Sequence, residues 1–206
     1  MSLDAILEKL EKNFKTLYEV HEQSVGNSRK ITKLSKQAIM AIHIGDHEKA
    51  EAKLSEAKAL IDETKKMVES YPEFIGRGSL YIACEEYAEA QILLNLIKQE
   101  VFLDPETIDV PPTSYILGLA DVIGELRRRA LDSIRRDELS SAEICLRLME
   151  EIYIGLMSME NAYNLAQGLR RKCDVARHLI ETTRSDITLE SRMKLLKSSI
   201  DSFKKL

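Results

Sequence analysis

Along most of the chain, hydrophobic side chains recur at every third or fourth position, the period of a helix that buries one face. Gly45 ends the first such pattern, and Asp46 is a typical first-turn cap for the second. The patterns predict seven helices, at about residues 3–44, 47–69, 73–102, 113–136, 140–159, 162–186 and 188–206. Because the connections are short, we expect an all-α, seven-helix bundle that forms a single domain over residues 1–206.

Local capping signals set several of the predicted boundaries. Thr113 follows a proline-rich loop and is a typical N-cap. Ser140 and Glu143 match a capping box, which predicts a helix start. Asn161 and Thr188 are expected to cap the last two helices.

The composition supports a helical protein and excludes several classes. Hydrophobic residues make up 44% and charged residues 31% of 206 residues, with 8 Gly and 4 Pro, which is typical of a helical globular chain. No apolar run is long enough to span a membrane, and no secretory pattern opens the chain. Three isolated cysteines are expected to be reduced core thiols of a cytoplasmic protein. A net charge of −4 argues against a uniformly basic nucleic-acid coat but allows a local basic surface.

Two carboxylates interrupt an otherwise apolar helix. Asp121 and Glu125 lie four positions apart, so both project from one face. Glu86 and Glu89, on the preceding predicted helix, also share a face. If the two helices pack antiparallel, the four carboxylates meet and form an all-oxygen site that suits Mg²⁺ or Mn²⁺. The alternatives are surface charge for the glutamates and ion pairs with the following arginines for Asp121 and Glu125.

Other sites are poorly supported. A di-iron carboxylate bundle needs a His three positions after a Glu, and this spacing is absent.

The predicted helix at 140–159 carries more apolar residues than one bundle face needs, which indicates either full burial or an oligomer interface.

At these residues the chain resembles the translin family, and within it the nuclease-competent translin-associated factor X branch. The stretch SYILGLADVIGEL at 114–126 is similar to the family's Tyr-Leu-Leu-Gly-x-Ala-Asp-x-x-Gly-Glu-Leu, and EYAEA at 86–90 resembles its Glu-x-x-Glu-Ala. The stretches at 33–36 and 171–174 agree more loosely. The short loop before residue 113 makes the chain look like a compact, archaeal-type homologue.

The resemblance implies a fold, an activity and an assembly. Translin-family chains form seven-helix bundles that assemble into hollow, often octameric shells and bind single-stranded RNA and DNA. The factor X branch is a Mg²⁺-dependent endoribonuclease, and its acidic residues fall here on Glu86, Glu89, Asp121 and Glu125. We therefore expect a homo-oligomer that cleaves single-stranded RNA with Mg²⁺ or Mn²⁺ as cofactor.

Basic residues complete the expected site. An Arg or Lys can clamp phosphate or track a single strand without reading its bases. The candidates are Lys30, Lys33, Lys36, Arg127, Arg128, Arg170 and Arg171. Two alternatives stay open: a non-catalytic oligomer that binds single-stranded RNA or DNA, and a helical scaffold without affinity for nucleic acid.

Overall fold

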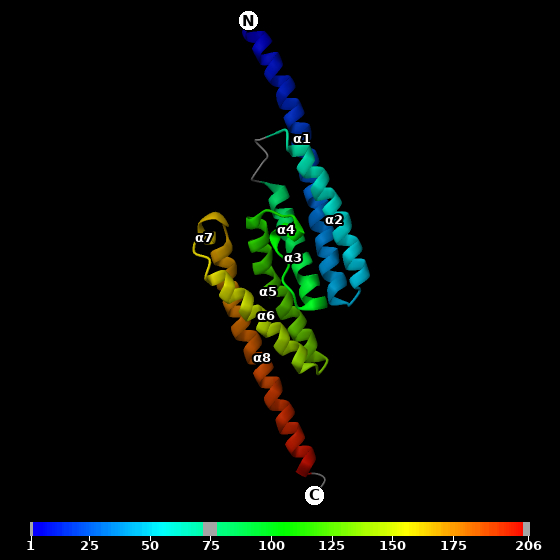
Figure 1. Ribbon diagram of the computed structural model, residues 1–206, viewed down its shortest axis with the longest axis vertical. Helices are drawn as coiled ribbons and strands as arrows, with labels where there is room; N and C mark the ends of the chain where they lie inside the picture. The colour runs from blue at the N-terminus through cyan, green and yellow to red at the C-terminus, as the bar shows by residue number, and fades with distance from the viewer. Residues whose placement is uncertain (1, 72–77, 204–206) are drawn as a thin grey trace. The chain divides into compact units, whose positions relative to one another are not determined.

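A computed structural model describes residues 2–71 and 78–203, and it confirms the all-α class. The described residues form eight helices and no strand, two of the helices being single turns (Figure 1). The helices are α1 (Leu3–His43), α2 (His47–Val68), α3 (Ser79–Gln99), α4 (Pro105–Ile108), α5 (Pro112–Arg135), α6 (Leu139–Met157), α7 (Ala162–Leu165) and α8 (Leu169–Phe203). The expected start of the third helix at 73–77 lies outside the described residues.

The chain divides into two compact units, residues 1–115 and 116–206, with the boundary inside α5. The first turn of α5 is tied to the first unit, because Ser114 Oγ donates to the Tyr81 carbonyl at 2.9 Å and Tyr115 Oη donates to the Leu103 carbonyl at 2.5 Å. Each unit has its own set of buried side chains. The single domain expected from the sequence stays a prediction.

In the first unit, α1 packs against α2 and α3, as Figure 1 shows for the blue-to-cyan pair α1 and α2. The turn between α1 and α2 follows the sequence: Gly45 adopts φ +80°, and the Asp46 carboxylate accepts from the Lys49 N–H at 3.1 Å. The core is aliphatic, with Ile42 and Leu93 fully buried. One buried polar pair crosses it, where Asn27 Nδ2 donates to Thr64 Oγ1 at 3.1 Å.

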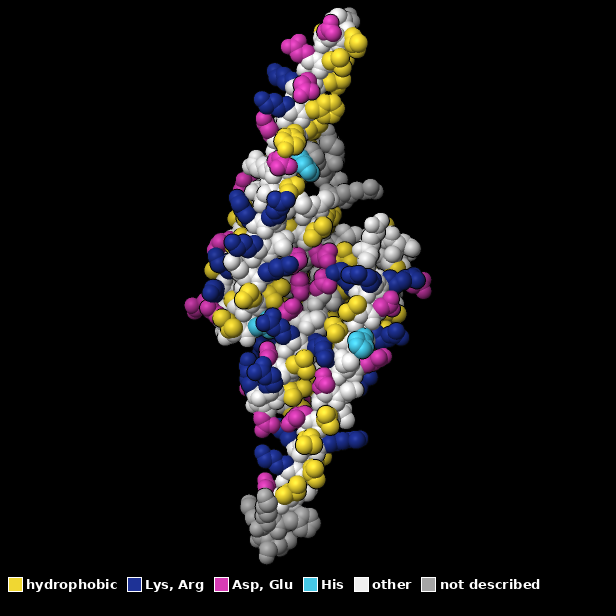
Figure 2. All heavy atoms as spheres, turned by 180° about the vertical axis from the view of Figure 1, so that it is seen from behind, with side chains coloured by type: hydrophobic (Ala, Val, Ile, Leu, Met, Phe, Trp, Pro, Cys, Tyr) yellow, Lys and Arg dark blue, Asp and Glu magenta, His cyan; other side chains and the backbone are white. Residues whose placement is uncertain are grey.

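Helix α1 carries one heptad seam whose two halves differ. Positions 24, 28, 31, 35, 38 and 42 are buried in the first unit. The same 4–3 spacing continues toward the N-terminus through Leu3, Leu7, Leu10 and Phe14, which are all exposed. Figure 2 shows this end of α1 with apolar side chains along one side and charged side chains along the other. The apolar stripe of α1 therefore extends beyond the core that its second half covers.

In the second unit, α6 and α8 pack together and their buried side chains include Met149, Leu156 and Leu169. The expected helix at 162–186 is wrong in its start. Helix α7 ends after one turn, and Gly168 takes φ +93° before α8 begins at Leu169.

The expected break at Thr188 is also wrong, since α8 runs unbroken for 35 residues. Thr188 Oγ1 donates to the Arg184 carbonyl one turn earlier at 2.7 Å, which satisfies the hydroxyl inside the helix instead of at a cap. The capping box fails as well, because the N-cap of α6 is Glu138 and has no side-chain capping bond. Thr113 lies inside α5, which starts at Pro112, in keeping with the preference of proline for a first turn.

None of the three cysteines forms a disulfide bond, and all three are buried. Burial raises the pKa of Cys84 to about 11, so its thiol stays protonated at neutral pH. No described helix is long and apolar enough to cross a membrane.

Candidate functional site

The first pair of acids lies on α3 in the first unit. Glu86 and Glu89 are one turn apart, between small or apolar neighbours that are themselves buried. Glu89 is 8% exposed, an unusual degree of burial for a carboxylate. Lys36 on α1 places its Nζ 3.3 Å from Glu86 Oε1, and the two side chains are 61% and 24% exposed. Helix α1 therefore supplies a cation to the acidic face of α3.

The second pair of acids lies on α5 in the second unit. Asp121 and Glu125 flank Val122 and Ile123, which are fully buried, so the acids mark the edge of an apolar face. Glu125 Oε2 lies 3.9 Å from an Arg128 nitrogen one turn along the helix. Both carboxylates are partly exposed, beside this buried aliphatic face.

Asp121 has a closer cation than Glu125 has, and this cation is Lys172 on α8. Its Nζ donates to Oδ1 at 2.6 Å and to Oδ2 at 2.5 Å, so one ammonium spans both oxygens of the carboxylate. The lysine and aspartate side chains are 25% and 34% exposed. Lys172 is not predictable as a functional residue from the sequence, because its partner lies 51 positions earlier and no local pattern connects the two.

The donor chemistry of these acids fits a hard divalent cation. Carboxylate oxygens are the preferred ligands of Mg²⁺ and Mn²⁺, and Glu86, Asp121 and Glu125 each lie beside a cation. Neither unit, within its described residues, gathers three or more His, Cys, Asp or Glu side chains in a metal-binding group. A site built from one unit alone would thus have at most two such ligands.

The candidate phosphate-binding residues fall into two groups. Lys30, Lys33 and Arg171 are exposed, and Arg128 is half-exposed beside Glu125. Arg170 stacks over the Tyr163 ring at 5.7 Å, a cation–π contact that leaves it at the surface. These side chains are accessible to a phosphate.

Arg127 is held differently from its neighbours. One guanidinium nitrogen donates to Thr183 Oγ1 at 2.7 Å, and another lies 3.4 Å from Asp186 Oδ2 on α8. The side chain is largely buried in the second unit. This arrangement joins α5 to α8 and gives Arg127 a structural task that the sequence did not indicate.

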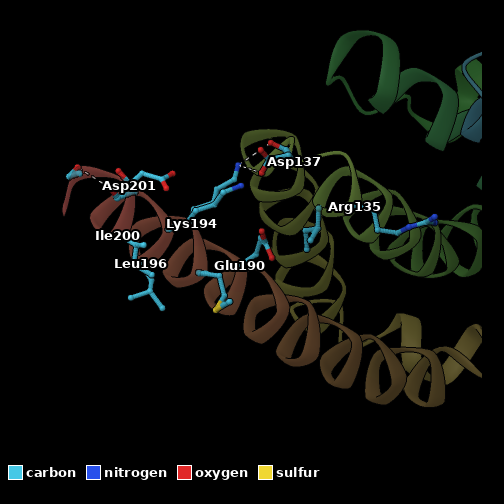
Figure 3. Close-up of a pocket in the computed structure, with 12 residues that line it drawn as sticks. Arg135, Asp137, Glu190, Lys194, Leu196, Ile200 and Asp201 are labelled. Carbon is cyan, nitrogen blue, oxygen red and sulfur yellow. Dashed lines mark hydrogen bonds and ion pairs between the residues drawn. The ribbon is translucent and has the colours of Figure 1, made fainter. Parts of the chain in front are cut away.

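A hollow of about 1010 Å³ lies beside the C-terminal half of α8 (Figure 3). Lys194 points toward Asp137 there, with its Nζ 2.7 Å from Oδ1 and 3.0 Å from the carbonyl oxygen. The contact fastens the turn after α5 to α8. None of the predicted acidic or basic site residues lines this hollow.

Comparison with known proteins gives a consistent family. Residues 70–201 match the model of the Translin family. An uncharacterized protein of Methanocaldococcus jannaschii, MJ0175, is 34% identical over 179 residues, which are 85% of this chain and 79% of that protein.

Solved structures agree with this match. The structure of AfC3PO in complex with duplex RNA superimposes with a TM-score of 0.80 at 34% identity, over 92% of this chain and 98% of that one. A crystal structure of AfC3PO gives 0.81 at 35% identity, and apo-NeC3PO gives 0.82 at 25% identity, both over the same shares of the two chains.

Proposed function

The chain belongs to the translin family, and from this premise we propose that it is an RNA-binding homo-oligomer that acts as a Mg²⁺-dependent endoribonuclease on single-stranded RNA. The observation that carries the proposal is the pair of partly buried carboxylates on each of two helices, Glu86 with Glu89 on α3 and Asp121 with Glu125 on α5. Acids so placed are costly for a fold unless a cation uses them.

RNA is the proposed ligand because a relative similar over almost its whole length, AfC3PO, is described in complex with duplex RNA. The exposed cations of this chain supply matching chemistry. Lys30 and Lys33 on α1, and Arg170 and Arg171 on α8, can each contact a phosphate without reading a base. The net charge of −4 means that binding depends on such local groups instead of on the overall charge.

Cleavage of a phosphodiester needs an attacking water and relief of the charge that builds on the phosphate. In the proposal Glu86 and Glu89 in the first unit, and Asp121 and Glu125 in the second, would supply carboxylate ligands to Mg²⁺ or Mn²⁺. A bound ion would supply an acidified water and would offset the charge on the phosphate. A carboxylate that is not occupied as a ligand accepts the proton of the attacking water, and Arg128 orients a phosphate beside Glu125.

Self-association is supported by apolar surface that the described chain leaves exposed. Leu3, Leu7, Leu10 and Phe14 form the uncovered half of the α1 seam. The apolar helix predicted at 140–159 is both core and surface: Met149 and Ile152 are buried, whereas Ile154 and Met157 of α6 are exposed. A homo-oligomeric shell, with eight subunits as is often found in the translin family, would cover these surfaces.

The test is a cleavage assay on end-labelled single-stranded RNA with purified oligomer. We expect internal cuts with Mg²⁺ or Mn²⁺ and none with EDTA. Asp121→Ala or Glu125→Ala should abolish cleavage and leave RNA affinity within a few-fold of wild type. Asp132→Ala is the matched control, because Asp132 is an acid of the same helix that pairs with Arg135 at 3.4 Å.

Each other result leads to a different function. Undiminished cleavage by clean Asp121→Ala and Glu125→Ala proteins removes the proposal that these acids catalyse cleavage. Salt-dependent RNA binding with no cleavage under any metal leaves a non-catalytic RNA-binding oligomer. Absence of binding to RNA and single-stranded DNA leaves a helical scaffold.

A further inference from the structure

The first turn of α8 has an unusual charge. Arg170, Arg171 and Lys172 occupy it in succession, and it contains no acid. A helix N-terminus carries partial positive charge from its unpaired N–H groups, so cations there are repelled and anions are favoured. Three cations at this place concentrate positive charge next to Asp121, and this needs an explanation beyond the stability of α8.

A hollow of about 450 Å³ lies where this turn meets α5. Asp121, Arg171 and Lys172 are its charged lining residues, and Gly124 and Gly168 leave its walls open where side chains would otherwise project. All of these residues belong to the second unit. The hollow therefore combines one carboxylate with two cations, which is a suitable lining for a metal-bound phosphate.

The ammonium of Lys172 occupies the place on Asp121 that a metal ion would need. It lies 2.6 and 2.5 Å from the two carboxylate oxygens, so both oxygens face the same positive group. A divalent cation bound to Asp121 would compete for those oxygens and would repel the ammonium. Lysine has a flexible stem and a point charge, so its ammonium can move while the backbone of α8 stays in place.

We propose that Lys172 is the displaceable counter-cation of Asp121. It holds the carboxylate in place while no divalent ion is bound, and it passes to an RNA phosphate in the hollow, beside Arg171, once an ion takes Asp121. This inference rests on the proposed function and adds a positioning residue to it. Metal binding and phosphate capture are then linked through one side chain.

The decisive experiment measures Mn²⁺ binding to the RNA-free oligomer by calorimetry. Lys172→Met removes the competing charge and keeps a similar length, so we expect Mn²⁺ to bind about tenfold more tightly than to wild type. Lys172→Arg keeps the charge and should stay near wild type. Lys194→Met is the matched control, because Lys194 lies on the same helix as Lys172 and forms a 2.7 Å ion pair with Asp137.

A second measurement needs no variant. In wild-type protein without RNA, Mg²⁺ should raise the rate at which an amine-acetylating reagent modifies Lys172, read by mass spectrometry, while the rate at Lys194 stays unchanged. RNA added after Mg²⁺ should lower the Lys172 rate again. This readout keeps the proposal testable if Lys172→Met does not fold.

The inference is overturned if Lys172→Met binds Mn²⁺ no more tightly than wild type, or if Mg²⁺ leaves the Lys172 acetylation rate unchanged. Either result in a protein that binds Mn²⁺ and cleaves RNA removes this inference alone and makes the contact a structural ion pair. If neither wild type nor Lys172→Met binds Mn²⁺, and RNA is not cut, the metal-dependent function fails together with it.

Discussion

The two units each contain a lysine that contacts an acid of the candidate site from another helix, and the two contacts differ in kind. Lys36 reaches one oxygen of Glu86 at 3.3 Å and is mostly exposed. Lys172 spans both oxygens of Asp121 and is three-quarters buried. An exposed pair is screened by water and contributes little, whereas a sheltered, two-point contact orders both side chains. Both contacts are lysine–carboxylate ion pairs, and the greater burial of the Lys172 pair makes it the firmer of the two.

The largest effect on stability is expected at Arg127, whose guanidinium contacts Thr183 and Asp186 on α8. Because its guanidinium is sheltered and donates to Thr183 at 2.7 Å, we expect Arg127→Met to lower the free energy of unfolding by about 1–3 kcal/mol. Urea titration followed by circular dichroism measures the loss. Arg128→Gln, at the half-exposed neighbour, should stay within about 0.5 kcal/mol and weaken RNA binding instead. Equal losses for the two variants would show that the contact to α8 does not stabilise the unit.

The direct comparison of the two lysine pairs should give a smaller difference. Lys172→Ala is expected to cost about 1–2 kcal/mol of unfolding free energy, because Asp121 loses its hydrogen-bonded partner. Lys36→Ala should cost about 0–1 kcal/mol. The same urea titration distinguishes them, and raising the salt concentration should reduce the Lys36 effect more. A larger loss at Lys36 than at Lys172 would contradict the ranking by burial.

The smallest expected effect concerns Asp109, which follows α4. Lys65 and then Lys58 lower the pKa of Asp109, and they do so mainly by hydrogen bonding to its carboxylate. A lowered pKa in the folded state means that this contribution is complete above the unfolded pKa near 4 and is lost as pH falls through the folded value.

Asp109→Asn should therefore be less stable than wild type by no more than about 1 kcal/mol at pH 7, since the carboxylate is exposed. The gap should close on acidification to about pH 2–3. Urea titrations of both proteins at the two pH values measure it. A gap that widens in acid would refute the assigned direction of the pKa.

Local chemistry explains which parts of this structure the sequence predicted. The turn at Gly45 and Asp46 depends on a left-handed residue and a cap, both of which are visible in a few letters. Gly168 offers the same kind of signal, but no break was predicted there, and a helix start was predicted at Thr188 instead. A threonine hydroxyl can bond inside a helix as well as at its start, so the pattern was ambiguous.

The candidate site divides in the same way. The pairing of the acids follows from spacing along one helix, but the burial of Glu89 does not. Their cations come from other helices, at separations such as the 51 positions between Asp121 and Lys172. Neither the role of Lys172 nor the attachment of Arg127 to α8 has a local signature. Both depend on packing that hydrophobic periodicity does not specify.

The three buried thiols offer a view of how this translin-family chain opens. Cys84 lies in the first unit and Cys145 and Cys173 in the second, and none forms a disulfide bond. A thiol-specific reagent reaches a buried sulfur only when its surroundings open transiently. The labelling rates of the three cysteines therefore report how often each surrounding region opens. A difference between the rates would show that the two units open separately and not together.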